Sequence, residues 1–341
     1  MSRCLFAILC GLLLFCPGCS LRSVDRQSDS FGVTFVIDGS NAGAGGEDPA
    51  GLTRATAAAD ETAVGDACLY FVNSAGAVVD AVSVSGNSVF RNFETGTYKA
   101  YYVANCGLGG QDFTSESGIN AFVRSLASET GAFSMFAVKT FSVPEDKTCS
   151  IAAERLVSKV EIDKISTDFS RYPDLAAQTF TIDSIYLVNV AGESTLADGT
   201  AFIPAASAWI NRQRYAASSA DVLLCDVVRQ TVTAARPHSV PHYFYCYQNN
   251  VGSDTHAKTW SARYTRLVVA CTLGATKTYY PIDIAGPQGR LSRNCRYVIS
   301  ELVITDLGSD APDNEITGRQ PFRFSVSVKD WEGNHTVSER F

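Results

Sequence analysis

The chain has 341 residues, of which 46% are hydrophobic and 18% are charged, and its formal net charge is −7. Its length predicts about two domains of roughly 150 residues each. The acidic balance argues against a nucleic-acid-binding protein, which needs a basic surface to displace counterions from phosphates. The 19 Phe and 14 Tyr residues argue against a disordered chain. The 11 cysteines leave open an exported protein with disulfides or a cytosolic zinc or redox protein.

The N-terminus has the pattern of a signal peptide. Arg3 precedes an almost wholly apolar run, residues 4–15, which is too short to span a bilayer as a mature helix. Gly18 before Cys19 resembles the lipobox of bacterial lipoproteins, in which this cysteine carries the lipid, although Cys16 stands where that pattern has Leu. We therefore expect a signal peptide over residues 1–18 and lipidation of Cys19, with ordinary signal peptidase cleavage as the alternative. The pair Cys16 and Cys19 then marks a processing site and not a metal site.

A strand and a loop come next. Four apolar residues alternate along the strand with the period of a half-buried β-strand: Phe31, Val33, Phe35 and Ile37. The segment 39–53 is dominated by Gly, Ala, Ser, Asn and acidic residues, a composition typical of a loop. It leads to Arg54 and Ala55 in a run of small residues, where a protease could bind the chain in extended form.

From residue 67 onward the sequence reads as short strands separated by turn residues. We expect strands over residues 68–72, 78–84, 89–93, 97–105, 133–143, 162–172, 180–190, 222–232, 242–247, 262–272, 277–284, 297–304 and 322–328. One helix interrupts them, because Ile119, Phe122, Val123 and Leu126 have helical spacing behind the capping candidate Ser115. This pattern is typical of an all-β fold, and a junction near residues 154–160 indicates two sandwiches.

The sequence contains no catalytic signature: it has no G-x-S-x-G, no H-E-x-x-H and no P-loop lysine. His238 and His242 have ligand-like spacing, but Pro237 and Pro241 exclude a regular helix, so we expect surface or edge histidines. Acidic residues such as Asp313 fall in turns, where carboxylates more often cap or solvate the backbone than catalyse. We therefore expect no enzyme activity, no metal site and no cofactor.

The cysteines beyond Cys19 are odd in number. They are Cys68, Cys106, Cys149, Cys225, Cys246, Cys271 and Cys295. An odd set cannot pair completely within one chain, so at least one cysteine stays buried and reduced or bonds elsewhere. One or two disulfides among these cysteines are possible, and the sequence does not assign their pairing.

Several short segments share their order with one known family. They are Thr53-Arg54-Ala55 followed by the strand 68–72, the strand 96–105 ending in Ala104-Asn105, the segment 155–160, and Tyr280-Pro281, Arg293-Asn294 and Asp330-Trp331. This order resembles that of the fimbrillins, the subunits of type V pili of anaerobic Gram-negative bacteria. The resemblance covers nearly the whole chain after residue 30.

The resemblance implies two transthyretin-like β-sandwich domains, which we place at residues 55–157, with a short helix insertion, and 158–341. Residues 19–54 would be a lipidated tether and a removable first strand. The resemblance also implies export to the outer membrane as a lipoprotein and cleavage between Arg54 and Ala55 by an Arg-specific protease. A sandwich that loses a strand exposes an apolar groove and unpaired backbone groups, and another fimbrial subunit can supply the replacement strand.

The C-terminus offers a strand for donation. One apolar face alternates with polar residues and is extended by a tryptophan: Phe322, Phe324, Val326, Val328 and Trp331. Residues 334–341 can add a second strand of a hairpin. The alternative is that residues 322–328 form the last strand of their own domain. Cleavage site and donor together favour a stalk subunit in a fimbrium on the extracellular face of the outer membrane; the alternatives are a fimbrial tip or anchor subunit and a surface glycan-binding lipoprotein.

Overall fold

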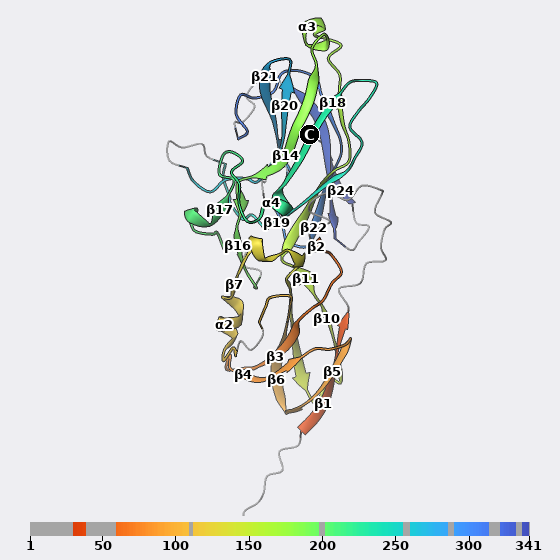
Figure 1. The fold of residues 1–341 in the computed structure, drawn as a ribbon. Coiled ribbons are helices and arrows are strands. Elements are labelled where there is room, and N and C mark those ends of the chain that lie inside the picture. The colour runs from red at the N-terminus through yellow and green to blue at the C-terminus, as the bar shows by residue number, and fades with distance from the viewer. Residues whose placement is uncertain are drawn as a thin grey trace, which may run out of the picture.

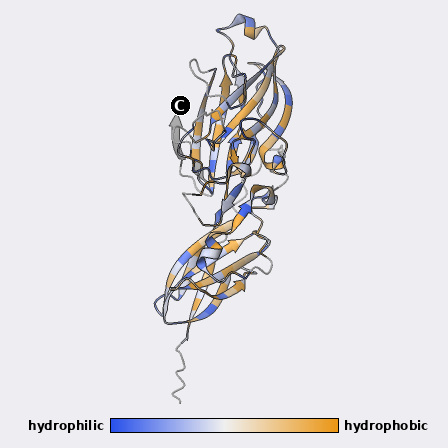
Figure 2. Cartoon of the chain, turned by 90° about the vertical axis from the view of Figure 1, so that its left-hand side faces the viewer, coloured by the Kyte–Doolittle hydropathy of each residue, from blue (hydrophilic) through white to orange (hydrophobic). Residues whose placement is uncertain are grey.

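The computed structural model describes residues 30–38, 59–108, 112–197, 202–254, 260–285, 290–313, 321–331 and 336–340. Cys19 and the Arg54–Ala55 bond lie outside these residues. The described chain forms two β-sandwiches stacked end to end, the first built from β1 to β11 and the second from β12 to β24 (Figure 1). Hydrophobic and hydrophilic residues alternate along many of the strands (Figure 2).

The N-terminal sandwich consists of a three-stranded and a five-stranded sheet, with strand orders β10-β1-β5 and β11-β9-β6-β3-β4. The strands are β1 (Ser30–Asp38), β3 (Ala67–Asn73), β4 (Val78–Ser83), β5 (Ser88–Glu94), β6 (Gly96–Ala104), β9 (Met135–Val143), β10 (Thr148–Ala152) and β11 (Glu154–Arg155). Two further short strands, β2 (Ala59–Asp60) and β8 (Gly131–Ala132), pair in parallel. The core between the sheets is rich in aromatic side chains. β10 was not predicted from the sequence.

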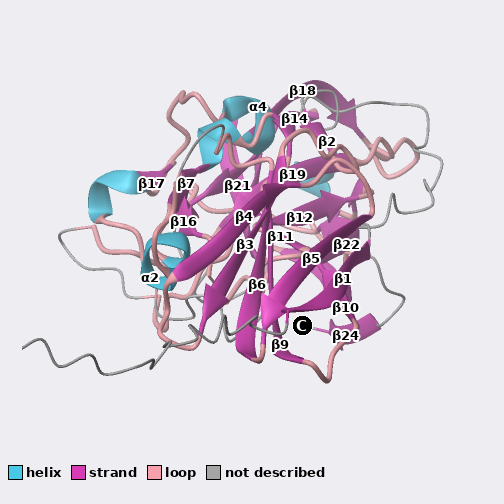
Figure 3. Ribbon diagram, turned by 90° about the horizontal axis from the view of Figure 1, so that it is seen from below, coloured by secondary structure: helices cyan, strands magenta, loops and turns pink. Residues whose placement is uncertain are grey.

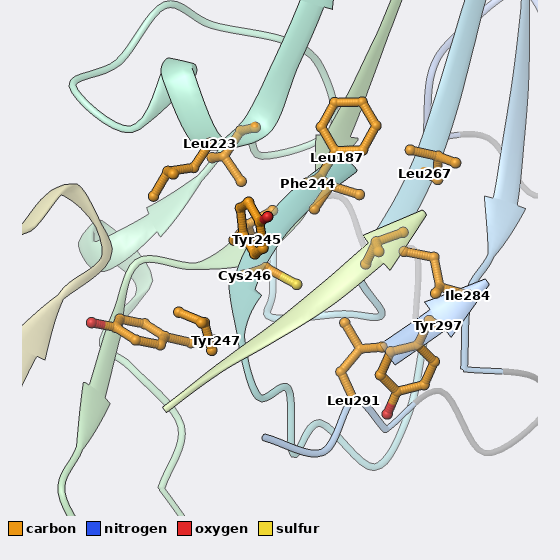
Figure 4. Close-up of a cluster of buried hydrophobic side chains, with 14 of the residues drawn as sticks. Leu187, Leu223, Phe244, Tyr245, Cys246, Tyr247, Leu267, Ile284, Leu291 and Tyr297 are labelled. Atoms are coloured by element: carbon orange, nitrogen blue, oxygen red, sulfur yellow. The ribbon is translucent and has the colours of Figure 1, made fainter. Parts of the chain in front are cut away.

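The C-terminal sandwich has a six-stranded sheet, ordered β19-β12-β22-β23-β24 with β13 also on β22, and a four-stranded sheet, ordered β18-β14-β20-β21. The first contains β12 (Val157–Ile162), β13 (Ile165–Thr167), β19 (His242–Tyr247), β22 (Cys295–Ile304), β23 (Phe322–Asp330) and β24 (Thr336–Arg340). The second contains β14 (Phe180–Val188), β18 (Cys225–Val232), β20 (Arg266–Leu273) and β21 (Thr276–Asp283). Leu187, Phe244 and Leu267 meet in the core between them (Figure 4).

Short elements connect these sheets. They are β15 (Val190–Ala191), which pairs with β17 (Trp209–Ile210), the helices α3 (Pro173–Ala176) and α4 (Asp221–Leu224), and the 3-10 turns η1 (Leu126–Ser128) and η2 (Ala206–Ala208). One further pair joins the two sandwiches, because β7 (Val123–Ser125) lies antiparallel to β16 (Glu193–Thr195). The hydrophobic cluster of the C-terminal sandwich also continues into the N-terminal one, where it includes Tyr70 and Phe133.

The predicted helix is shorter than its periodicity indicated. α2 covers only Glu116–Asn120, with the Ser115 hydroxyl accepting a hydrogen bond from the Gly118 N–H at 3.3 Å. Val123, expected on the helix, lies instead in β7 opposite Thr195. Pairing with β16 therefore overrides the helical spacing, because the strand satisfies the backbone of both segments where the two sandwiches meet.

Candidate assembly site at the first strand

β1 is the central strand of its sheet. It runs antiparallel to β5 and parallel to β10, and the three strands lie side by side in the view from below (Figure 3). The Thr34 N–H donates to the Lys147 carbonyl and the Ile37 N–H donates to the Asn87 carbonyl, both at 2.9 Å. Without β1, both β5 and β10 would have an unpaired edge facing the space between them, and unpaired backbone groups are unfavourable.

The apolar face of β1 points into the core. Val33 and Phe35 are fully buried, Ile37 is nearly so, and Phe31 is half-buried at the start of the strand. Burial of such side chains contributes on the order of 1.5–3 kcal/mol each. β1 is therefore integral to the hydrophobic core of the N-terminal sandwich, although it is joined to the rest of the described chain only through the segment that contains Arg54.

Phe35 makes the densest aromatic contacts of the strand. Its ring centroid lies 4.8 Å from that of Phe71, 5.0 Å from Phe141 and 6.1 Å from Phe93. These partners come from β3, β9 and β5, so the ring meets side chains of both sheets. Tilted and edge-on aromatic pairs at such distances stabilise a core beyond the area that they bury.

The start and the outer face of β1 are more open. The Lys147 ammonium lies 5.2 Å from the centroid of the Phe31 ring. On the outer face, a Cβ atom at Gly32 would lie 2.3 Å from the tip of the Phe90 ring, whose residue is 58% exposed. Gly32 therefore leaves room for the Phe90 ring to lie against the backbone of β1.

The residue that follows β2, Glu61, is held at the boundary between the two sandwiches. Its carboxylate accepts hydrogen bonds from Lys159 Nζ at 2.7 Å, Tyr245 Oη at 2.5 Å and Trp331 Nε1 at 3.1 Å. Its backbone carbonyl accepts from Arg155 Nε at 3.1 Å and Nη2 at 2.9 Å. Although burial opposes ionisation, the Lys159 charge and these hydrogen bonds hold the pKa of Glu61 below its usual range. No signal in the sequence identifies this role, because the partners are distant along the chain.

The predicted donor residues lie in β23, within the sheet of their own domain. Phe322 and Val326 are 4% and 3% exposed, and Phe324 and Val328 are partly buried against the same core. β23 pairs with β22 on one side, whereas β24 is the edge strand and pairs with β23 alone. Trp331 follows β23 and stacks on Tyr245 with a centroid distance of 5.9 Å. Before any assembly, residues 322–328 therefore form a strand of their own domain, as in the alternative given in the sequence analysis.

The two histidines with ligand-like spacing are buried and not at the surface, although His242 begins β19, which is an edge strand of its sheet. His238 and His242 are 3% and 7% exposed, and their Nε2 atoms lie 2.7 Å apart. His238 Nδ1 faces Gln230 Oε1 at 2.6 Å, and His242 Nδ1 faces Asp226 Oδ2 at 2.8 Å. Burial and the neighbouring His242 lower the pKa of His238 to about 4. Sequence reasoning missed the pair because the partners are on β18, the opposite sheet.

Asp313 lies in a turn, as expected, but its carboxylate is bonded to side chains and not to the backbone. It is buried and accepts hydrogen bonds from Asn189 Nδ2 at 2.6 Å, Arg263 Nη1 at 2.8 Å and Arg266 Nη1 at 3.1 Å. Its carboxylate therefore joins the chain after β22 to the sheet that contains β14 and β20.

Within the described ranges, no three or more His, Cys, Asp or Glu side chains are arranged to hold a metal ion. No helix in that part of the chain is long and apolar enough to cross a membrane. The seven cysteines that the structure describes form no disulfide with one another, so the one or two bonds that the sequence left open are not formed.

No protein-family model and no curated protein sequence matches the chain. Among solved structures, it is similar to a candidate cell adhesion protein from Bacteroides eggerthii DSM 20697, with 16% identity and a TM-score of 0.59 over 89% of this chain and 97% of that chain. It is similar to a fimbrilin from Porphyromonas gingivalis W83, with 16% identity and a TM-score of 0.59 over 88% and 97% of the two chains.

A third similar structure is a candidate cell adhesion protein from Parabacteroides distasonis ATCC 8503, with 16% identity and a TM-score of 0.57 over 90% of this chain and 98% of that chain. All three likenesses extend over both sandwiches, which confirms the predicted all-β fold class. The chain therefore has the two-domain β-sandwich fold of a fimbrilin and of these cell adhesion proteins.

Proposed function

We propose that the protein is a structural subunit of a pilus of the fimbrillin type. The observation that carries this proposal is the position of β1, whose apolar side chains complete the core of the N-terminal sandwich. Arg54 lies in the segment that connects β1 to β2. A strand held in this way can be exchanged for one from another subunit after a single cut in the connecting segment. The shared fold with a fimbrilin supports the same function.

The proposed pathway has three steps. The chain is exported as a lipoprotein, with the lipid on Cys19, and reaches the outer membrane. An Arg-specific protease cuts between Arg54 and Ala55, which separates the lipid and β1 from residues 55–341. Another fimbrial subunit then supplies a strand to the groove between β5 and β10, and repetition of this step on the extracellular face yields the fimbrium. The boundary of the two mature domains, placed from the sequence between residues 157 and 158, falls at the start of β12 (Val157–Ile162).

We propose the C-terminal strand pair as the donor. Within the pair, β24 is an edge strand, so its departure breaks its backbone pairing with β23 and with no other strand that the structure describes. The departure of β23 would also remove Phe322 and Val326 from the core of the C-terminal sandwich. The cost of release therefore rises sharply from β24 to β23, and β24 is the part that leaves first.

The experiment treats the purified full chain with an Arg-specific protease, reads the new N-terminus and examines the product by electron microscopy. We expect Ala55 as the new N-terminus and fibres after cleavage. Arg54→Ala should abolish both, whereas Arg26→Ala, which removes an arginine ahead of β1, should leave both unchanged. An Arg54→Ala protein that still polymerises, or a cut protein that stays monomeric, would contradict the proposal.

A further inference from the structure

The four inward positions of β1 differ in what surrounds them. Phe31 is half-buried at the start of the strand, and Val33 and Ile37 are buried β-branched residues. Phe35 is 0% exposed and contacts three aromatic rings. The groove that β1 fills therefore has one site shaped for an aromatic ring between two sites that hold β-branched side chains.

The neighbours of Phe35 within its own sheet explain why a ring fits there. Phe35 lies opposite Val89 on β5 and Cys149 on β10. Both are small and buried, which leaves width for a ring between the two strands. Phe71 and Phe141 close the site from the facing sheet. By contrast, Phe31 lies opposite another aromatic residue, Phe93, at the end of the β5 pairing.

A smaller side chain at position 35 would leave a cavity lined by Phe71, Phe93 and Phe141. Large-to-small substitutions in such cores cost both the lost burial and the cavity, and Phe→Ala costs are among the largest. The three surrounding rings are held by different strands and can move only a little to fill this cavity, because close-packed interiors relax only in part. The site therefore discriminates against strands without an aromatic residue at this register.

We propose that this aromatic site selects the strand that replaces β1. The partner is an extended segment of another pilus subunit that places an aromatic side chain at the position of Phe35, with apolar residues two positions before and after it on the same face, as Phe324 stands between Phe322 and Val326 in β23. This requirement follows from β1 itself, which places Val33, Phe35 and Ile37 in the groove. The inference rests on the proposed function, since the site becomes available only when β1 can leave.

The test measures strand exchange with variant peptides, so that no residue of the protein itself is substituted. The full chain is cut with an Arg-specific protease and mixed with an excess of fluorescently labelled peptide of residues 30–38, and binding is followed by anisotropy. Three variant peptides are compared with the wild type: Phe35→Ala, Phe35→Leu and, as the matched control, Phe31→Ala.

We expect the wild-type peptide to bind and the Phe31→Ala peptide to bind within about threefold of it. The Phe35→Ala peptide should bind roughly 100-fold more weakly, as expected for a ring removed from a closed site, and the Phe35→Leu peptide should fall between the two. Equal losses for Phe31→Ala and Phe35→Ala, or a full recovery by leucine, would overturn the aromatic selection while leaving strand exchange intact. Failure of the wild-type peptide to bind would overturn the proposed function and this inference together.

Discussion

The indole nitrogen of Trp331 donates a hydrogen bond to the Glu61 carboxylate at 3.1 Å, across 270 residues of sequence. The Arg155 guanidinium also lies 5.0 Å from the centre of the Trp331 ring, and the same Arg155 donates to the Glu61 carbonyl. The end of β23 and the segment that follows the predicted cleavage site therefore meet at one place between the two sandwiches. These contacts connect the N-terminal sandwich to the C-terminal strand pair. Substitutions at them therefore measure how firmly that pair is held before assembly.

Replacement of Glu61 should loosen this junction. Glu61→Ala leaves the buried ammonium of Lys159 without its carboxylate partner, and loss of one partner of a largely buried ion pair is strongly destabilising. We expect the free energy of unfolding to fall by about 2–4 kcal/mol, a range below the fully buried limit because the Glu61 side chain keeps some solvent contact. Urea unfolding of the full chain measures the change. Glu154→Ala, at an exposed position of β11, is the control and should change stability little.

Removal of the ring at position 35 should destabilise the N-terminal sandwich in the uncut chain. Phe35→Ala deletes a fully buried side chain with three aromatic partners, and we expect a loss of about 3–5 kcal/mol. Thr34→Ala changes the opposite face of the same strand and should cost far less. Thermal unfolding followed by circular dichroism compares the two variants, and similar shifts for both would show that the ring is not central to the core.

The rate at which the Cys149 thiol is alkylated should show whether β1 has left the N-terminal sandwich. The Cys149 side chain is buried beside Phe35, and burial, together with the nearby Asp146, raises the pKa of its thiol, so that alkylation is slow while β1 is in place. After cleavage and displacement of β1, we expect alkylation of Cys149 to accelerate at least tenfold. Peptide mapping by mass spectrometry measures each thiol separately. Cys246, buried in the C-terminal core, should stay unreactive in both states, and unchanged protection of Cys149 after displacement would argue against an opened groove.

The buried histidine pair should make the C-terminal sandwich sensitive to acid. The pKa of His238 is lowered from 6.5 to about 4 in the folded protein by burial and by His242. Between these two values the unfolded chain binds a proton that the folded chain does not, so stability falls as the pH drops from about 6.5 to about 4. Thermal unfolding at several pH values should show a smaller decrease over this window for His238→Gln than for the wild type. Parallel pH profiles for the two proteins would contradict the prediction.

Much of the strand content could be predicted because the alternation of apolar residues is a local property. The apolar face of β1 follows from the spacing of Val33, Phe35 and Ile37, and the paired sheets confirm the all-β class. The helix around Phe122 was overestimated because β16, the partner strand of β7, lies about 70 residues further along the chain and is invisible to local periodicity. β10 was missed although Cys149 and Ile151 alternate with polar residues, because five residues are a short signal.

The sequence by itself determined which residues share a face along the strands with alternating apolar residues, such as β1, since a pleated strand places alternate side chains on opposite faces whatever its neighbours are. Only the tertiary structure decided that β1 lies between β5 and β10, that Phe35 meets three rings, and that Glu61 meets Trp331. It also decided that His238 and His242 are buried against each other, where the sequence indicated surface or edge histidines. These relationships depend on which distant segments pack together, and that choice is made by the free energy of the whole core and not by any local pattern.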